Sequence, residues 1–159
     1  MGKVLSSFNH GWPGTIARSV DDIVISMPNL SDKPIAYGMP VVLSDNKDGV
    51  IPFDCDLYYP QDFIGVTVRT PSKTPAEYGS SEGSYAPGEM VDILVRGHIT
   101  VQISKGIPDV CDTVAIEKAT NLFAGGSGQD YIVLPNAIFS ATKDDNMRIE
   151  ILLKERNLL

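Results

Sequence analysis

Four side chains in this sequence have the chemistry of a nucleophile or a soft metal ligand: two cysteines and two histidines. Cys55 lies between Asp54 and Asp56, and Cys111 is followed by Asp112, so each thiol has a carboxylate beside it. Neighbouring strand residues point to opposite faces, and neither cysteine has the CxxC or HExxH spacing that gathers ligands around one metal ion. We therefore expect no metal site, no cofactor, and two reduced, packed thiols.

The histidines give little support for catalysis. His10 lies among turn-forming residues, and His98 lies on the polar face of an alternating segment. A hydrolase holds a nucleophile, a base and an orienting acid in one pocket, and the chain has no nucleophile elbow or comparable signature. The glycine-rich run 124–128 lacks the Lys-Ser/Thr of a phosphate-binding loop. The sequence predicts a protein that is not an enzyme, with a small hydrolase as the least favoured alternative.

Composition and charge narrow the classes of partner. The 159 residues are 43% hydrophobic and carry a net charge of −7, which suits a single domain with its own core. No cluster of Lys and Arg is available to neutralise phosphates, so we expect no nucleic-acid partner. No apolar run approaches the roughly 18 residues of a membrane span, so we expect no membrane partner.

Alternation of apolar and polar residues marks the central strand of the domain. From Val91 to Ile103 every second residue is apolar, except at Gly97. The solvent-facing phase is expected to hold Asp92, Arg96, His98, Thr100 and Gln102. Gly97 is either the centre of a three-residue hairpin loop or a bend in one long strand. A bulged three-residue loop places its glycine last, so the bent strand is favoured.

Shorter alternating segments are separated by Gly, Pro, Asn and Asp turns. They are Asp22–Met27, Met39–Ser44, Phe63–Arg69, Asp112–Glu117, Tyr131–Leu134, Ala137–Thr142 and Met147–Lys154. Pro135-Asn136 is expected to be a turn, and Glu117–Ala124 a short helix. The expected fold class is all-β, a sandwich or barrel of short, mostly antiparallel strands with an extended N-terminal arm.

Residues 1–20 form that arm, ahead of a single β domain over residues 21–159. A regular helix or central strand is prevented there by Gly11, Pro13 and Gly14. The bulky groups Phe8, Trp12 and Ile16 must either pack back on the domain or bind a partner, and tryptophan is favoured as an interface anchor. Deleting residues 1–20 is expected to leave folding nearly intact.

A long loop over residues 70–89 is the second unusual feature of the domain. It contains three prolines and three glycines among serines. Loops of this length are usually functional or disordered. Tyr78 and Tyr85 supply it with aromatic side chains suited to contact.

Several of these segments resemble one known family. Tyr85–Ile103, with the proline-containing stretch before it, resembles the central segment of the structural cement proteins of tailed bacteriophages. Gly11–Ser19 is similar to the glycine- and proline-containing N-terminal arm of that family. Tyr37–Leu43 and Phe63–Arg69 are similar to its early strands.

The resemblance implies a virion structural protein that decorates the capsid exterior and stabilises the head by bridging capsid subunits. It implies the major capsid protein as partner, a homotrimer, and assembly in the bacterial host cytoplasm. The expected capsid contacts are the arm residues Phe8, Trp12, Pro13, Ile16 and Arg18, and the expected subunit contacts are Tyr78 and Tyr85. The alternative is a β-sandwich module that binds host-surface carbohydrate, which predicts a concave cluster of aromatic residues.

Overall fold

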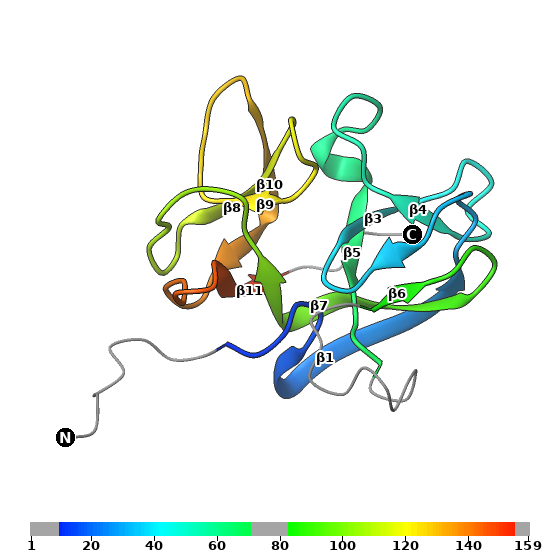
Figure 1. Ribbon diagram of the computed structural model, residues 1–159, viewed down its shortest axis with the longest axis horizontal. Helices are drawn as coiled ribbons and strands as arrows, with labels where there is room; N and C mark the ends of the chain where they lie inside the picture. The colour runs from blue at the N-terminus through cyan, green and yellow to red at the C-terminus, as the bar shows by residue number, and fades with distance from the viewer. Residues whose placement is uncertain (1–9, 71–82, 155–159) are drawn as a thin grey trace.

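The computed structural model of the chain describes residues 10–70 and 83–154 (Figure 1). Regular structure in these residues is β-strand, apart from one 3₁₀ turn, η1 (Pro60–Asp62). The strands are β1 (Ile16–Pro28), β2 (Ile35–Ala36), β3 (Pro40–Leu43), β4 (Val50–Pro52), β5 (Phe63–Thr67), β6 (Ser84–Tyr85), β7 (Met90–Gln102), β8 (Thr113–Glu117), β9 (Phe123–Ala124), β10 (Tyr131–Phe139) and β11 (Arg148–Leu153). The all-β prediction is confirmed. In the described part of the chain no helix is long and apolar enough to cross a membrane.

Nine of these strands form one antiparallel sheet. Its order is β4-β3-β5-β7-β11-β10-β8-β9, and β1 also pairs with β7. Two isolated β-bridges connect strands that are not neighbours in this order, so the sheet is curled. Asn29, after β1, pairs with Val50 of β4, and Ile103, after β7, pairs with Phe123 of β9. The sheet is therefore a half-barrel, in which β7 joins the β3–β5 group to the β8–β11 group (Figure 1).

The central strand β7 is continuous over 13 residues and bends at Gly97, as predicted. The hairpin alternative is wrong, since β11 pairs with β7 in unbroken register from Gly97 to Gln102. Gly97 has a φ of +123°, and a Cβ at this position would overlap the Asp22 carboxylate, so the site requires glycine.

The bend at Gly97 divides the apolar residues of β7 between two cores. Val91, Ile93 and Val95 belong to one buried cluster, and Ile99, Val101 and Ile103 belong to the other. Leu94, from the opposite phase, is also fully buried in the second cluster. The strand therefore serves two cores, whereas the alternation predicted a single buried face.

The larger core fills the half-barrel and joins strands on either side of β7. Phe63 of β5 and Phe123 of β9 meet edge to face, with ring centres 6.5 Å apart. Both rings are almost completely buried, and each contributes roughly 1.5–3 kcal/mol relative to an exposed position. This contact lies between strands far apart in the sheet order, so it supports the curl directly.

Four predicted strands are confirmed within a few residues. They are Met39–Ser44, Phe63–Arg69, Asp112–Glu117 and Met147–Lys154, which correspond to β3, β5, β8 and β11. The first strand was predicted over Asp22–Met27 but begins at Ile16. Three register shifts in its pairing with β7 allow a stretch without regular alternation to remain in the sheet.

Two local predictions are wrong. The segment Glu117–Ala124 is not a helix but the tight turn between β8 and β9, together with β9 itself. The Glu117 carbonyl accepts hydrogen bonds from the Thr120 and Asn121 amides, and Asn121 adopts a φ of +55°. Pro135-Asn136 does not reverse the chain either. It is a bulge inside the continuous strand β10, where the pairing with β8 shifts between Val133 and Ile138.

The segment after β5 contains a core tyrosine. Ser84–Tyr85 pairs with β2, and the Tyr85 hydroxyl donates to the Val68 carbonyl at 2.6 Å. Tyr85, which was expected to make a subunit contact, is only 1% exposed and lies in the smaller core of the chain. Its neighbours Ser84 and Ala86 are exposed. Tyr78 lies outside the described residues.

Candidate functional site: the docked N-terminal segment

Residues 10–18, called here the docked segment, lie against β7, β11 and the residues that follow β5 (Figure 1). The Gly14 amide donates to the Thr100 carbonyl at 2.8 Å, and the Thr100 amide donates to the Thr15 carbonyl at 2.9 Å. On the other side, the Arg69 amide donates to the Gly14 carbonyl at 2.8 Å. The segment is therefore held by backbone bonds from two elements. Thr100, which was expected to face solvent, is fully buried beside it.

A turn at residues 12–15 fits the segment into this gap. The Thr15 amide donates to the Trp12 carbonyl at 3.1 Å. Gly14 has a φ of +84°, and a Cβ there would lie 2.9 Å from the Arg69 nitrogen and 3.0 Å from the Thr67 oxygen. Both the left-handed backbone and the close approach favour glycine. Pro13 and Gly14, which exclude a helix from the arm, thus also allow it to pack closely on the domain.

His10 anchors the start of the docked segment. Its carbonyl accepts a hydrogen bond from the Thr100 hydroxyl at 2.7 Å, and its ring Nε2 donates to the Thr142 carbonyl at 2.6 Å. Its amide donates to the Asp144 carboxylate at 3.3 Å. Asp144 is buried, and its other oxygen accepts from the Asn146 and Arg148 amides. One carboxylate therefore links the segment to the loop before β11.

Trp12 lies between two arginines. The guanidinium carbon of Arg148 is 4.0 Å from the Trp12 ring centre, and that of Arg69 is 5.8 Å from it. Arg69 is also 5.6 Å from the Tyr37 ring centre, and Arg148 donates from Nη1 to the Gly11 carbonyl at 3.0 Å. Cations and aromatic rings therefore alternate from Arg148 to Tyr37. Such contacts contribute about 0.5–1 kcal/mol each when exposed and about 2 when desolvated.

The other expected arm residues also contact their own domain. Pro13 packs against Gly38, where an added Cβ would lie 2.8 Å from the proline Cβ. Ile16 pairs with Ile99 and packs on the larger core. Arg18 is exposed and pairs through Nε with the Glu150 carboxylate at 3.1 Å. Phe8 lies outside the described residues.

Four expected site residues therefore contact the β domain from the docked segment: Trp12, Pro13, Ile16 and Arg18. Four residues that hold the docked segment were not predicted from the sequence, namely Thr100, Asp144, Arg69 and Arg148. The Lys143–Asn146 stretch has the composition of a turn. No local pattern in it indicates that the Asp144 carboxylate accepts a hydrogen bond from the His10 amide, which is more than a hundred residues away. Arg69 and Arg148 look like ordinary strand-end residues.

The cysteines do not form a reactive site with these residues. Both are free, Cys55 buried and Cys111 exposed, so the expectation of two packed thiols is correct only for Cys55. Burial, followed by the charges of Asp54 and Asp56, raises the pKa of the Cys55 thiol to about 11. This thiol is therefore protonated at neutral pH and is a poor nucleophile. In the described residues no group of three or more His, Cys, Asp or Glu side chains could hold a metal ion.

A half-barrel of antiparallel strands with its N-terminal segment seated across the central strand defines a small all-β structural domain. The family model described as structural cement protein (E217 gp24/Pam3 gp6) matches residues 3–154, and the chain belongs to that family. In fold it is similar to a solved chain from "The capsid of Myoviridae Phage XM1", with a TM-score of 0.76, 14% sequence identity and 96% of each chain covered. No curated protein matches the chain. The protein is therefore a structural component of a phage virion.

Proposed function

We propose that this protein decorates the exterior of a phage capsid and stabilises the head by bridging neighbouring capsid subunits. Family membership over nearly the whole chain carries this proposal. A protein that binds the assembled shell preferentially stabilises that state by mass action. Its partner is then the major capsid protein, and assembly takes place in the host cytoplasm.

The docked segment supports a role for the arm in this contact. Its backbone is fixed by hydrogen bonds to β7 and Arg69, so the exposed Arg18 and the half-buried Trp12 are presented in one orientation. Preorganised groups lose less conformational entropy on binding than mobile ones. We propose that Phe8, Trp12 and Arg18 contact the capsid, and that Pro13 and Ile16 position them.

A homotrimer is the proposed working form. Three copies joined around an axis each present one arm, so the arms bind with avidity although each single contact is weak. The exposed residues Ser84 and Ala86, rather than the buried Tyr85, are the proposed subunit contacts from the segment after β5.

Co-sedimentation with heads that lack the protein tests the capsid role, and light scattering tests the oligomer. We expect binding that saturates at a fixed number of copies per head, and a solution mass three times the 17.2 kDa of the chain. Failure to bind heads at any concentration below aggregation would contradict the decoration role. A solution monomer that still saturated heads would contradict the trimer alone.

A further inference from the structure

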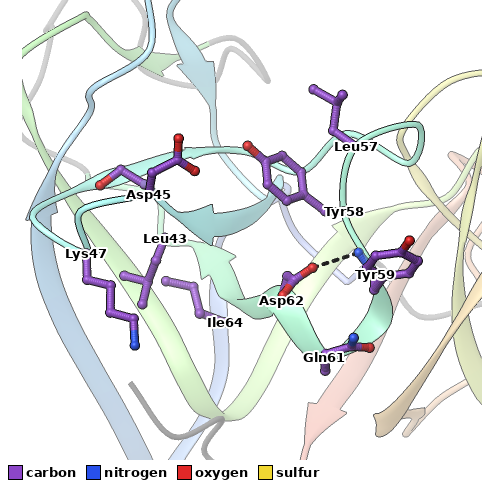
Figure 2. A pocket seen from close by; sticks show the side chains of 10 residues that line it. Leu43, Asp45, Lys47, Leu57, Tyr58, Tyr59, Gln61, Asp62 and Ile64 are labelled. Carbon is purple, nitrogen blue, oxygen red and sulfur yellow. Dashed lines mark hydrogen bonds between the residues drawn. The ribbon is translucent and has the colours of Figure 1, made fainter.

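A second surface lies far from the docked segment in sequence, where the β3–β4 turn faces the loop that leads into η1. Between them is an open cleft of about 440 Å³ (Figure 2). It is lined by Leu43, Ser44, Asp45, Lys47, Leu57, Tyr58, Tyr59, Gln61, Asp62 and Ile64. Ligand sites commonly have volumes of about 300–1,000 Å³, so the cleft has room for a small ligand.

The loops that make the cleft are held in place by their own hydrogen bonds. The Tyr59 amide donates to the Asp62 carboxylate at 2.8 Å (Figure 2), and the Asp62 amide donates to the Tyr59 carbonyl at 3.0 Å. On the opposite wall the Ser44 hydroxyl donates to the Asp48 carboxylate at 2.7 Å. The Tyr58 ring packs against the ring of the core residue Phe53, with ring centres 6.2 Å apart. The cleft is therefore largely preformed.

The side chains of this cleft combine exposed apolar surface with hydrogen-bonding groups of both kinds. Leu57 and Tyr59 are 69% and 68% exposed, so their apolar surface is available to a ligand. Asp45 and Asp62 supply acceptors, Lys47 supplies a donor, and Gln61 supplies both. Aromatic side chains beside carboxylate and amide groups match a sugar ring, which has apolar C–H faces and hydroxyls that both donate and accept.

The charged side chains that line the cleft indicate which class of saccharide it could bind. The two carboxylates outnumber the single lysine in the lining, so phosphorylated or acidic saccharides would meet net repulsion. No cysteine or histidine lines the cleft. We propose that this cleft binds a neutral saccharide of one or two rings, with Tyr59 packing on a ring face and Asp45, Gln61 and Asp62 bonding to hydroxyls. The aromatic residues of the chain are few and scattered in sequence, and those that line this cleft are the adjacent Tyr58 and Tyr59.

This activity would be additional to capsid decoration, and its avidity rests on the proposed function, because decoration is what would place many copies on one particle. Many copies on one particle would convert weak single sites into adhesion to a glycan-bearing surface, because multivalent attachment raises the overall affinity without new contacts. A single site therefore needs only millimolar affinity.

Nuclear magnetic resonance titration of the full chain tests the site directly. The probes are maltose, cellobiose, lactose and N,N′-diacetylchitobiose, each raised to millimolar excess. We expect at least one disaccharide to shift amide signals confined to residues 43–47 and 57–64. Tyr59→Ala should weaken that binding about tenfold, and Asp45→Asn should weaken it without unfolding, since Asp45 is exposed. Ile107→Ala is the matched control, because Ile107 is 84% exposed and lies outside the cleft.

Two results would overturn the saccharide site. One is the absence of localised shifts with all four probes, and the other is binding that Tyr59→Ala leaves unchanged. Head binding measured on the same variants separates the two proposals. Loss of head binding in Tyr59→Ala, without any sugar effect, would assign the cleft to a protein partner instead.

Discussion

The guanidinium of Arg148 lies over the ring of Trp12, 4.0 Å from the ring centre, and donates a hydrogen bond to the carbonyl of the preceding residue, Gly11. Arg148 is the first residue of β11, while Trp12 lies before β1. The contact therefore joins the two ends of the described chain across the central strand. It explains why the only tryptophan is half-buried against its own domain rather than fully exposed.

Replacing Trp12 with alanine should affect both stability and head binding. The variant loses its contacts with Arg148 and Arg69, so we expect the free energy of unfolding to fall by about 1–3 kcal/mol. If Trp12 is also an interface anchor, the free energy of head binding should fall by at least ~2 kcal/mol. Denaturant unfolding and co-sedimentation measure the two effects separately.

Trp12→Phe is the control for this change, because a phenyl ring keeps part of the stacking surface. It should retain most of the stability and of the head binding. An alanine variant that unfolds earlier but binds heads normally would show that Trp12 acts only within the domain, and would remove it from the proposed capsid contacts.

Gly14→Ala tests the close approach that seats the docked segment. The new Cβ would meet backbone atoms of Arg69, Gly38 and Thr67 at 2.9–3.0 Å, in a residue whose φ is +84°. We expect a loss of about 2–3 kcal/mol in the free energy of unfolding, at the upper end of the cost of backbone strain. Gly11→Ala is the matched control, because Gly11 has a similar φ of +82° but nothing within 4 Å of an added Cβ. Equal losses in both variants would show that strain, and not the close approach, dominates.

The strands of this protein could largely be predicted, because alternation depends on neighbours in sequence. The bend at Gly97 could also be predicted locally, from the position of the glycine between two alternating segments of the same phase. The division of β7 between two cores was not, since Val95 and Ile99 have the same apolar character on either side of the bend and differ only in which distant strands cover them.

The docked segment could be predicted only in part. Its glycines and proline excluded a helix, but packing on the domain and binding to a partner both remained open, because both bury the same apolar groups. Burial of Thr100 and the position of Asp144 depend on contacts with His10 more than 80 residues away. Short-range patterns contain no information on such contacts.

Glu117 should make the stability of the protein depend on pH. Its carboxylate is only 3% exposed and pairs with the Lys105 ammonium at 2.6 Å. The hydrogen bond from Lys105, followed by those involving Ser104 and Thr120, lowers the pKa of Glu117 from 4.5 to about 2. A carboxyl whose pKa is lower in the folded state stabilises that state above its unfolded pKa. This stabilisation should therefore be complete above about pH 5 and be lost as the pH falls from 4.5 to about 2.

Glu117→Gln isolates this effect. Its melting temperature should lie below that of the unmodified protein at pH 7, and the difference between the two should shrink as the pH approaches 2. Asp130→Asn is the control, because Asp130 is an exposed acid near the same turn. A difference in melting temperature between Glu117→Gln and the unmodified protein that stayed constant from pH 7 to pH 2 would contradict the lowered pKa.

The two cysteines should differ sharply in reactivity with a thiol reagent such as Ellman's reagent. Cys111 is exposed, whereas Cys55 is buried and has a pKa raised to about 11. The folded protein should show one fast thiol near pH 8, and a second only after denaturation. Cys111→Ser should abolish the fast reaction. Two fast thiols in the folded protein would show that the loop containing Cys55 opens readily.

Two truncations distinguish the contribution of the arm to stability from its proposed contribution to capsid binding. Deletion of residues 1–20 was expected from the sequence to leave folding nearly intact, but it would remove the first five residues of β1 and the bonds of Gly14 and Thr15 to Thr100. We now expect this variant to lose several kcal/mol of stability, since several hydrogen bonds and the buried surface of Ile16 are lost together. Deletion of residues 1–9 keeps every contact described above and should leave the melting temperature unchanged.

Head binding then distinguishes the parts of the arm. If Phe8 and its neighbours contact the capsid, deletion of residues 1–9 should weaken co-sedimentation at least tenfold while the fold persists. If only the docked segment is used, that truncation should bind normally and Trp12→Ala or Arg18→Ala should not. Normal binding by all three variants would contradict the proposed role of the arm, and the contact surface would then have to lie on the β domain itself.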